Sequence, residues 1–254
     1  GMEECQFDIV GVENNTTVEI TPINSDISGA HPAGVPFQIT LNQGDVYQYQ
    51  SYDELSGTKV TSISNGGSCK KIVVFGSTTR SAIGCGTASS GDNLFQQLTP
   101  IPSWGKNYIT VPFALKSRDI IRIYISNPLT PVIVNGVPLP LGSLINNSYY
   151  EYSTNSPQEI TSTEGIAVYQ YIVTQNCDGV QSDPEMILIN SLEQTLNDLS
   201  FVSAHMSLTP PNTNISSHYV NITLKNTGTA LSSLRVDCLP PLVAFTPIAA
   251  TGYV

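Results

Sequence analysis

Short runs of alternating apolar and polar residues recur along most of the chain, and Gly, Pro and Asn bound them. Such alternation places apolar side chains on one face of an extended strand and is typical of half-buried antiparallel strands. Only segment 186–199 spaces Ile and Leu by three and four residues, which predicts a short helix. The pattern therefore predicts an all-β fold with at most one short helix. The expected strands include residues 18–20, 37–41, 120–125, 131–134, 166–172 and 219–224.

The strand pattern also repeats along the chain. Segment 8–20 resembles segments 121–133 and 219–231, and each reads as a strand, an Asn-centred turn and a second strand. The repeat of about 100 residues is too long for a propeller blade or a solenoid turn and fits a sandwich-sized unit. We expect two tandem antiparallel β-sandwich-like modules, residues 1–115 and 116–254. The second would include the first half of a third repeat, and the natural protein is expected to continue beyond it.

Charge narrows the choice of partner. The chain has 10 Lys+Arg against 20 Asp+Glu, a net charge of -10, and it has no basic run. Nucleic acid and anionic membranes are therefore poor partners, because the chain could not neutralise them. No apolar run approaches the roughly 18 residues of a spanning helix, so no membrane insertion is expected. Gly1 ahead of Met2 is typical of a cleavage scar, and a signal peptide is expected to have preceded it.

Five cysteines are widely spaced, without the paired spacing that zinc sites need. The segment between Cys69 and Cys85 is interpreted as a hairpin that turns about Ser77, which would place these two cysteines opposite each other. A Cys69–Cys85 disulfide is the leading prediction, Cys177 is a rival partner for Cys85, and free buried thiols are the alternative. A disulfide would imply an oxidising compartment.

The sequence contains few candidate catalytic residues. His31, His205 and His218 are the only histidines, and the Gly-x-Ser-x-Gly elbow does not occur, so no catalytic residue is assigned. The acidic pairs 53–54 and 183–185 could serve a glycosidase, but acidic residues in loops are more typical of turns.

A calcium ion is the one cofactor considered. Asp178, Asp183 and Glu185 offer oxygen ligands in a loop that contains Gly179. The spacing lacks the regular pattern of a dedicated calcium loop, so a solvated hairpin loop is the alternative.

Several segments occur in the order seen in one known family. They are residues 57–62, 72–76, 93–106, 131–136 and 176–186, of which 97–106 is the most specific. Over roughly residues 45–250 the chain resembles the N-terminal domain of IgGFc-binding proteins. The resemblance implies a secreted or surface-displayed protein, mucin-associated in animals and part of large adhesion-like proteins in bacteria. A bacterial source is the expectation here. Residues 85–91 depart from the family pattern.

These observations predict a non-enzymatic, extracellular or cell-surface module for cell adhesion or ligand binding that recognises a protein or a glycan. The candidate ligand-binding residues are Trp104, Asp92, Asn93 and Lys106, on or beside loops that interrupt the repeat. Trp104 has an alternative role as a core residue beneath a crossover. A structural spacer in a larger surface protein is the second hypothesis, and a carbohydrate-active enzyme is the third.

Overall fold

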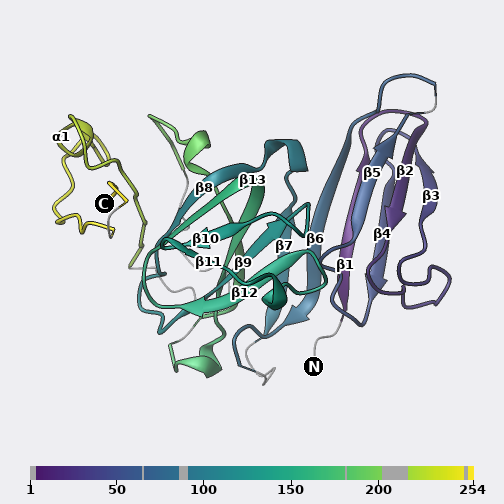
Figure 1. The fold of residues 1–254 in the computed structure, drawn as a ribbon, viewed down its shortest axis with the longest axis horizontal. Helices are drawn as coiled ribbons and strands as arrows, with labels where there is room; N and C mark the ends of the chain where they lie inside the picture. Colours follow the sequence, from purple (N-terminus) through teal and green to yellow (C-terminus); the bar gives the residue numbers. More distant parts are fainter. Residues whose placement is uncertain (1–3, 65, 86–90, 181, 202–216, 249–250) are drawn as a thin grey trace, which may run out of the picture.

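The computed structural model describes residues 4–64, 66–85, 91–180, 182–201, 217–248 and 251–254. Its strands form two successive groups, followed by a C-terminal segment of little regular structure (Figure 1). The first group contains β1 (Cys5–Gly11), β2 (Thr16–Thr21), β3 (Phe37–Leu41), β4 (Val46–Ser51), β5 (Lys59–Ile63), β6 (Ile72–Ser81) and β7 (Asp92–Gln97). The second contains β8 (Gly105–Thr110), β9 (Asp119–Ile125), β10 (Val132–Val134), β11 (Val137–Pro138), β12 (Tyr149–Thr154), β13 (Gln158–Ile172) and β14 (Glu185–Ile189).

All strand pairs are antiparallel, and the described residues contain a single α-helix, α1 (Ala230–Ser233). Short 3-10 turns lie at η2 (Ile101–Ser103), η3 (Leu141–Ser143), η4 (Gln175–Cys177) and η5 (Leu192–Gln194). The predicted all-β class with at most one short helix is confirmed.

The two groups share one strand order. In the first group the sheets are β4-β1-β6-β7 and β3-β2-β5. In the second, β12, β9, β13 and β14 follow the order of the first sheet, and β11, β10 and β13 follow the order of the other. The long strand β13 thus occupies the positions of both β5 and β6 in this strand order. For the first two copies, the repeat found in the sequence is seen in the structure as a repeat of strand order.

Strand β13 serves two sheets because its ladder is interrupted. Residues 158–162 pair with β8 and β10, and residues 166–172 pair with β9 and β14. The register shifts between Thr161 and Ile166, as expected where a bulge redirects a strand. A Cβ atom at Gly165 would lie 3.1 Å from the backbone oxygen of Trp104, so the close approach at this bend suits glycine.

Each group encloses its own apolar core between its two layers of strands. Alternate residues of β1 and β9 point inward, which is the pattern the sequence predicted. The first core consists of Cys5, Phe7, Ile9, Val18, Ile20, Leu41, Tyr49 and Leu55. The second consists of Tyr108, Ile121, Ile123, Ile125, Val132, Tyr150, Ile160, Ile166 and Val168.

A third cluster joins the two groups, and we call it the junction. The outer face of sheet β12-β9-β13-β14 carries Ala167, Tyr169 and Tyr171, which are buried against Leu94 of β7. Both faces of β13 are consequently buried from residue 166 to residue 171. Burial of the large side chains of Leu94, Tyr169 and Tyr171 stabilises the contact by several kcal/mol, at about 1.5–3 kcal/mol for each.

Arg122 of β9 is the charged centre of the junction. Its guanidinium lies 3.0 Å from Glu54 of the first group and also pairs with Glu151 of β12. The rings of Tyr149 and Tyr171 lie 4.8 and 5.4 Å from its Cζ atom. Burial opposes ionisation of Glu54, but Arg122 and Ser56 together hold the pKa of that carboxyl below its ordinary value.

Three expectations about local structure are wrong. The hairpin about Ser77 is a continuous ten-residue strand, β6, because β1 and β7 pair with it on either side. The predicted helix 186–199 is strand β14 followed by the 3-10 turn η5, because the edge of β13 supplies backbone partners. The predicted strand 219–224 has no ladder partner among the described residues, and the C-terminal segment holds isolated bridges such as Lys225 to Tyr253.

Replacing Arg122 by Met should lower the free energy of unfolding by about 2 kcal/mol at pH 7, because Glu54 and Glu151 would lose their partner in a partly buried site. Urea denaturation measures this change. The matched control is Arg235→Met, since Arg235 is exposed and bonds only to nearby backbone carbonyls; its effect should stay within about 0.5 kcal/mol.

The effect of Arg122→Met should depend on pH. Because the folded-state pKa of Glu54 is below its ordinary value of 4.5, the pairing stabilises the fold above that pH and is lost as the pH falls through the lowered value. The difference between the wild type and the variant should therefore shrink at about pH 3. An equal difference at pH 7 and pH 3 would show that lost packing, not charge, causes the effect.

Candidate functional site

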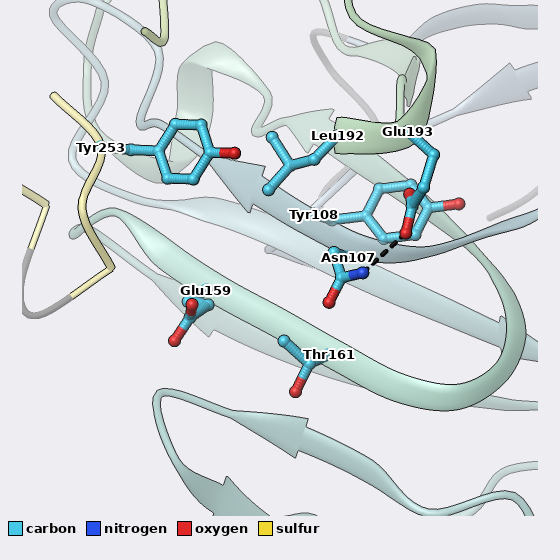
Figure 2. A pocket seen from close by; sticks show the side chains of 7 residues that line it. All are labelled: Asn107, Tyr108, Glu159, Thr161, Leu192, Glu193 and Tyr253. Carbon is cyan, nitrogen blue, oxygen red and sulfur yellow. Dashed lines mark hydrogen bonds between the residues drawn. The ribbon is translucent and has the colours of Figure 1, made fainter. Parts of the chain in front are cut away.

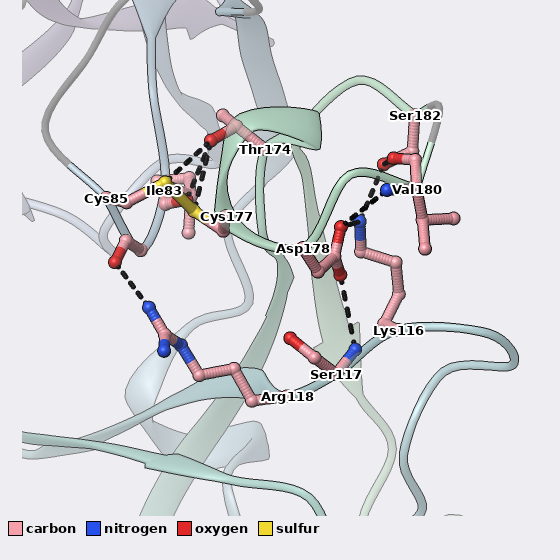
Figure 3. Close-up of a disulfide and its surroundings, with 11 residues drawn as sticks. Ile83, Cys85, Lys116, Ser117, Arg118, Thr174, Cys177, Asp178, Val180 and Ser182 are labelled. Atoms are coloured by element: carbon pink, nitrogen blue, oxygen red, sulfur yellow. Dashed lines mark hydrogen bonds and ion pairs between the residues drawn. A yellow bond between two sulfur atoms is a disulfide. The ribbon is translucent and has the colours of Figure 1, made fainter.

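A disulfide between Cys85 and Cys177 lies where the two groups of strands meet (Figure 3). Their Cα atoms are 5.6 Å apart, and 92 residues separate them in the sequence. The leading prediction, Cys69–Cys85, is wrong, and the rival partner Cys177 is correct. The continuous strand β6 explains this, because at about 3.4 Å per residue it holds Cys69 and Cys85 near its opposite ends. Cys69 is exposed and unpaired.

Hydrogen bonds reinforce the contact around this disulfide. Both the backbone N–H and the hydroxyl of Thr174 donate to the carbonyl of Ile83, at 3.0 and 3.2 Å. Arg118 donates from Nη2 to the carbonyl of Gly84 at 2.7 Å (Figure 3). The disulfide is thus part of a larger set of links between β6 and the end of β13.

The candidate calcium ligand Asp178 already has a cationic partner. Its carboxylate lies 2.9 Å from Nζ of Lys116, and both side chains are only 4% exposed. The backbone N–H groups of Ser117 and Val180 also donate to it. Burial opposes ionisation, but the bond from Lys116 and these two bonds lower the pKa of Asp178. This carboxylate is thus satisfied without a metal ion.

The other two candidate ligands belong to a different environment. Burial raises the pKa of Glu185, and the negative charges of Asp92 and Asp183 add to that rise. Among the residues that the structure describes, no three His, Cys, Asp or Glu side chains are placed to hold a metal ion. The calcium hypothesis for Asp178, Asp183 and Glu185 therefore finds no support among the described residues, and Asp178 is paired with Lys116 instead.

Trp104 lies half-buried against the junction. Its indole N–H donates to the carbonyl of Thr99 at 3.0 Å, and its side chain packs on the cluster around Tyr169. This placement agrees with its alternative role as a structural residue beneath the connection from β7 to β8.

The remaining predicted ligand-binding residues lie in two places. Asp92 and Asn93 are exposed at the start of β7, whereas Lys106 is exposed on β8. The Nζ atom of Lys106 donates to the carbonyl of Thr163 at 2.7 Å. The structure therefore does not gather all four predicted residues into one site.

A shallow pocket of about 340 Å³ opens beside Lys106, and sequence reasoning missed it (Figure 2). Asn107 donates to Glu193 at 2.6 Å across one wall, and Glu159 and Tyr253 lie opposite (Figure 2). The lining comes from β8, β13, η5 and the chain end, so no local sequence pattern reveals it. Its residues are Asn107, Tyr108, Glu159, Thr161, Leu192, Glu193 and Tyr253.

Glu193 contributes a negative charge to this pocket. Burial opposes its ionisation, yet the bond from Asn107 and further hydrogen bonds, including one from the backbone of Lys106, lower the pKa of Glu193 below its ordinary value. The pocket therefore presents a carboxylate, an amide and aromatic and aliphatic surfaces, which suits polar ligands that also carry apolar groups.

Cys5 is a free thiol buried in the first core, and its raised pKa makes it unreactive. Burial, and then the charge of Glu54, raises the pKa of Cys5 to about 11, so the thiol stays protonated at neutral pH. His31 stacks on Phe37 at 3.7 Å between ring centroids, while His205 lies outside the described residues.

Replacing Cys177 by Ser should lower the free energy of unfolding by about 2–5 kcal/mol, because the disulfide closes a long loop that the unfolded chain would otherwise leave free. Guanidinium denaturation under non-reducing conditions measures the change. Cys69→Ser is the matched control and should leave stability unchanged. A loss of stability in the Cys69 variant instead would favour the Cys69–Cys85 pairing.

Comparison with known proteins adds a family to this geometry. The family model described as IgGFc binding protein matches residues 1–254. A human relative named IgGFc-binding protein is 25% identical over 170 residues, which cover 63% of this chain and 3% of that relative. No solved structure matches the chain. None of the described helices is long and apolar enough to cross a membrane.

The resemblance that residues 57–62 and 97–106 carry is thereby extended to the full sequence. The relative is human, so the expectation of a bacterial source finds no support in these comparisons. Because the family match spans every residue, the chain belongs to the IgGFc binding protein family.

Proposed function

We propose that this chain is a non-enzymatic, extracellular module that binds a protein or glycan ligand as part of a secreted or surface-displayed protein. Membership in the IgGFc binding protein family over residues 1–254 carries the proposal. The Cys85–Cys177 disulfide supports an oxidising compartment, where such bonds persist. Adhesion to a cell or matrix component is the role that this architecture suits.

The pocket beside Lys106 is the surface that we propose for ligand contact. Glu159 and Glu193 line the concavity, and the exposed Lys106 adjoins it beside Asn107 on β8; charged groups at a rim orient a partner and favour its approach. Trp104 packs on the junction, so in this proposal it has a structural role and does not contact the ligand. Asp92 and Asn93 remain a second candidate contact on β7.

The constant region of immunoglobulin G is the first protein ligand to test. The name of the human relative says that it binds this fragment, but the chain spans 3% of that relative's length. Binding by the whole relative does not identify which of its parts is responsible, so the isolated chain must be tested directly.

The purified, disulfide-bonded chain should bind at least one component of an array of extracellular proteins, the immunoglobulin G Fc fragment and glycans. Lys106→Ala should weaken binding to a protein ligand severalfold, because a charge at the contact is lost. Lys59→Ala is the matched control, since Lys59 is exposed on β5.

Two results would contradict the proposal. If the chain bound no component of the array, the proposed binding function would be wrong. Robust turnover in a panel of hydrolase substrates would favour the carbohydrate-active enzyme instead. Equal binding by the two lysine variants would leave the function in place but move the contact away from Lys106.

A rigid spacer is the second candidate, and the junction is the observation that favours it. The Cys85–Cys177 disulfide, Arg122 and the cluster around Tyr169 join the two groups of strands into one stiff unit. The test replaces this chain by an unrelated rigid module in a parent protein that keeps its other modules. Retained adhesion after this replacement would support the spacer.

A further inference from the structure

The described part of the chain leaves the outer face of sheet β4-β1-β6-β7 uncovered. Its inner face packs on the first core and, at β7, on the junction. The strand register places two rows of side chains on the outer face, and we call these eight positions the amide face. The rows are Gln48, Asp8, Phe75 and Gln97, and Gln50, Gln6, Ser77 and Phe95, none of which is buried.

We propose that the amide face binds neutral oligosaccharides. This inference rests on the proposed function and adds to it a ligand class and a second surface, distinct from the pocket beside Lys106. Four adjacent strands place its outermost side chains about 14 Å apart, at about 4.8 Å between neighbouring strands, so the surface is broad enough for an extended ligand.

Cross-strand hydrogen bonds hold the polar groups of this face in position. Gln50 donates from Nε2 to Oε1 of Gln6 at 2.9 Å, and Gln48 donates from Nε2 to Oδ1 of Asp8 at 3.0 Å. Each amide retains an unused donor or acceptor, while every sugar hydroxyl can both donate and accept. Because the side chains are already ordered, ligand binding would lose less conformational entropy.

Two phenylalanines supply the apolar part of the face. The rings of Phe75 and Phe95 stack with centroids 5.0 Å apart and an interplanar angle of 17°, and Phe95 remains 56% exposed. A sugar ring presents a face of C–H bonds, whose partial positive charge suits the negative face of an aromatic ring. Ser77 lies directly opposite Phe95 and two residues along β6 from Phe75. Its hydroxyl is shielded and has no hydrogen-bond partner among the described residues. A ligand hydroxyl beside Phe95 could supply that partner after a small shift of the ring.

The charge of the face favours neutral over anionic sugars. Its two rows contain no Lys or Arg, and Asp8 lies among them. The chain as a whole carries a net charge of -10. Sulfated or sialylated sugars would therefore approach a surface of their own sign without a cation to pair with.

The equivalent face of the second group argues against a protein occupant. The outer face of β12-β9-β13-β14 is covered by protein, and there the buried residues are Ala167, Tyr169 and Tyr171. Apart from its two phenylalanines the amide face consists of Gln, Ser and Asp, and it lacks the Tyr, Trp, Met and Arg that, with Phe, are enriched in protein interfaces. A glycan fits this composition better than another protein module does.

The test uses the full disulfide-bonded chain on neutral oligosaccharides of glucose, galactose and N-acetylglucosamine, each with its sulfated counterpart. The chain should bind a neutral oligosaccharide, and Phe95→Ala should weaken that binding roughly tenfold, because one aromatic platform contributes up to about 1.5 kcal/mol. Phe201→Ala is the matched control, since Phe201 is 62% exposed outside this face. Phe95→Trp should retain binding.

The double variant Gln48→Ala, Gln50→Ala gives a second test that leaves both phenylalanines in place, and it should also weaken binding. Retained binding in both Phe95→Ala and this double variant would overturn the inference, as would equal or tighter binding of the sulfated sugars. A protein ligand on the array without any neutral sugar would overturn this inference alone and leave the proposed binding function standing. Binding to nothing on either array would remove both.

Discussion

The architecture depends on one requirement: the apolar outer face of sheet β12-β9-β13-β14 must be covered. Tyr169 and Tyr171 lie on that face of β13, while Ile166 and Val168 fill the core on the other face. A strand buried on both faces needs a protein layer on each side. The first group supplies the outer layer through β7, so the two groups cannot be independent sandwiches that merely follow each other along the chain.

Arg122 explains why this cover is specific as well as apolar. A guanidinium surrounded by tyrosine rings is satisfied only if carboxylates reach it, and one of them, Glu54, comes from the first group. The hydroxyl groups of Ser56 and Tyr124 lie 2.9 Å apart at the same contact. Gly57 has a φ of +106° and lies so close to Ser148 that a Cβ atom would be 2.7 Å from its Oγ atom. Charge pairing and close approach together define one relative placement of the two groups.

The repeat could be predicted from the sequence, but the contacts between its copies could not. Alternation along residues such as Phe7 and Ile123 identifies a strand and its inner face, because periodicity is a local property. The pairing of Cys85 with Cys177 depends on how two distant strands end, and a hairpin is a reasonable but wrong interpretation of the segment between Cys69 and Cys85. Helical spacing in segment 186–199 was likewise overridden, because the edge of β13 offered backbone partners to β14.

The candidate binding surfaces depend on which sheet faces are covered by protein and which are left exposed. A sheet face that protein covers selects residues such as Tyr169, whereas a face left to water tolerates Gln6 and Gln50. Within one repeated strand order, the covered and uncovered faces therefore show different chemistry although their backbones follow the same plan. The sequence alone could not show which face is covered, because in both groups the outward positions simply alternate with the apolar positions that face the core. Only the placement of β7 over the second sheet decides which polar or aromatic positions remain available to a ligand.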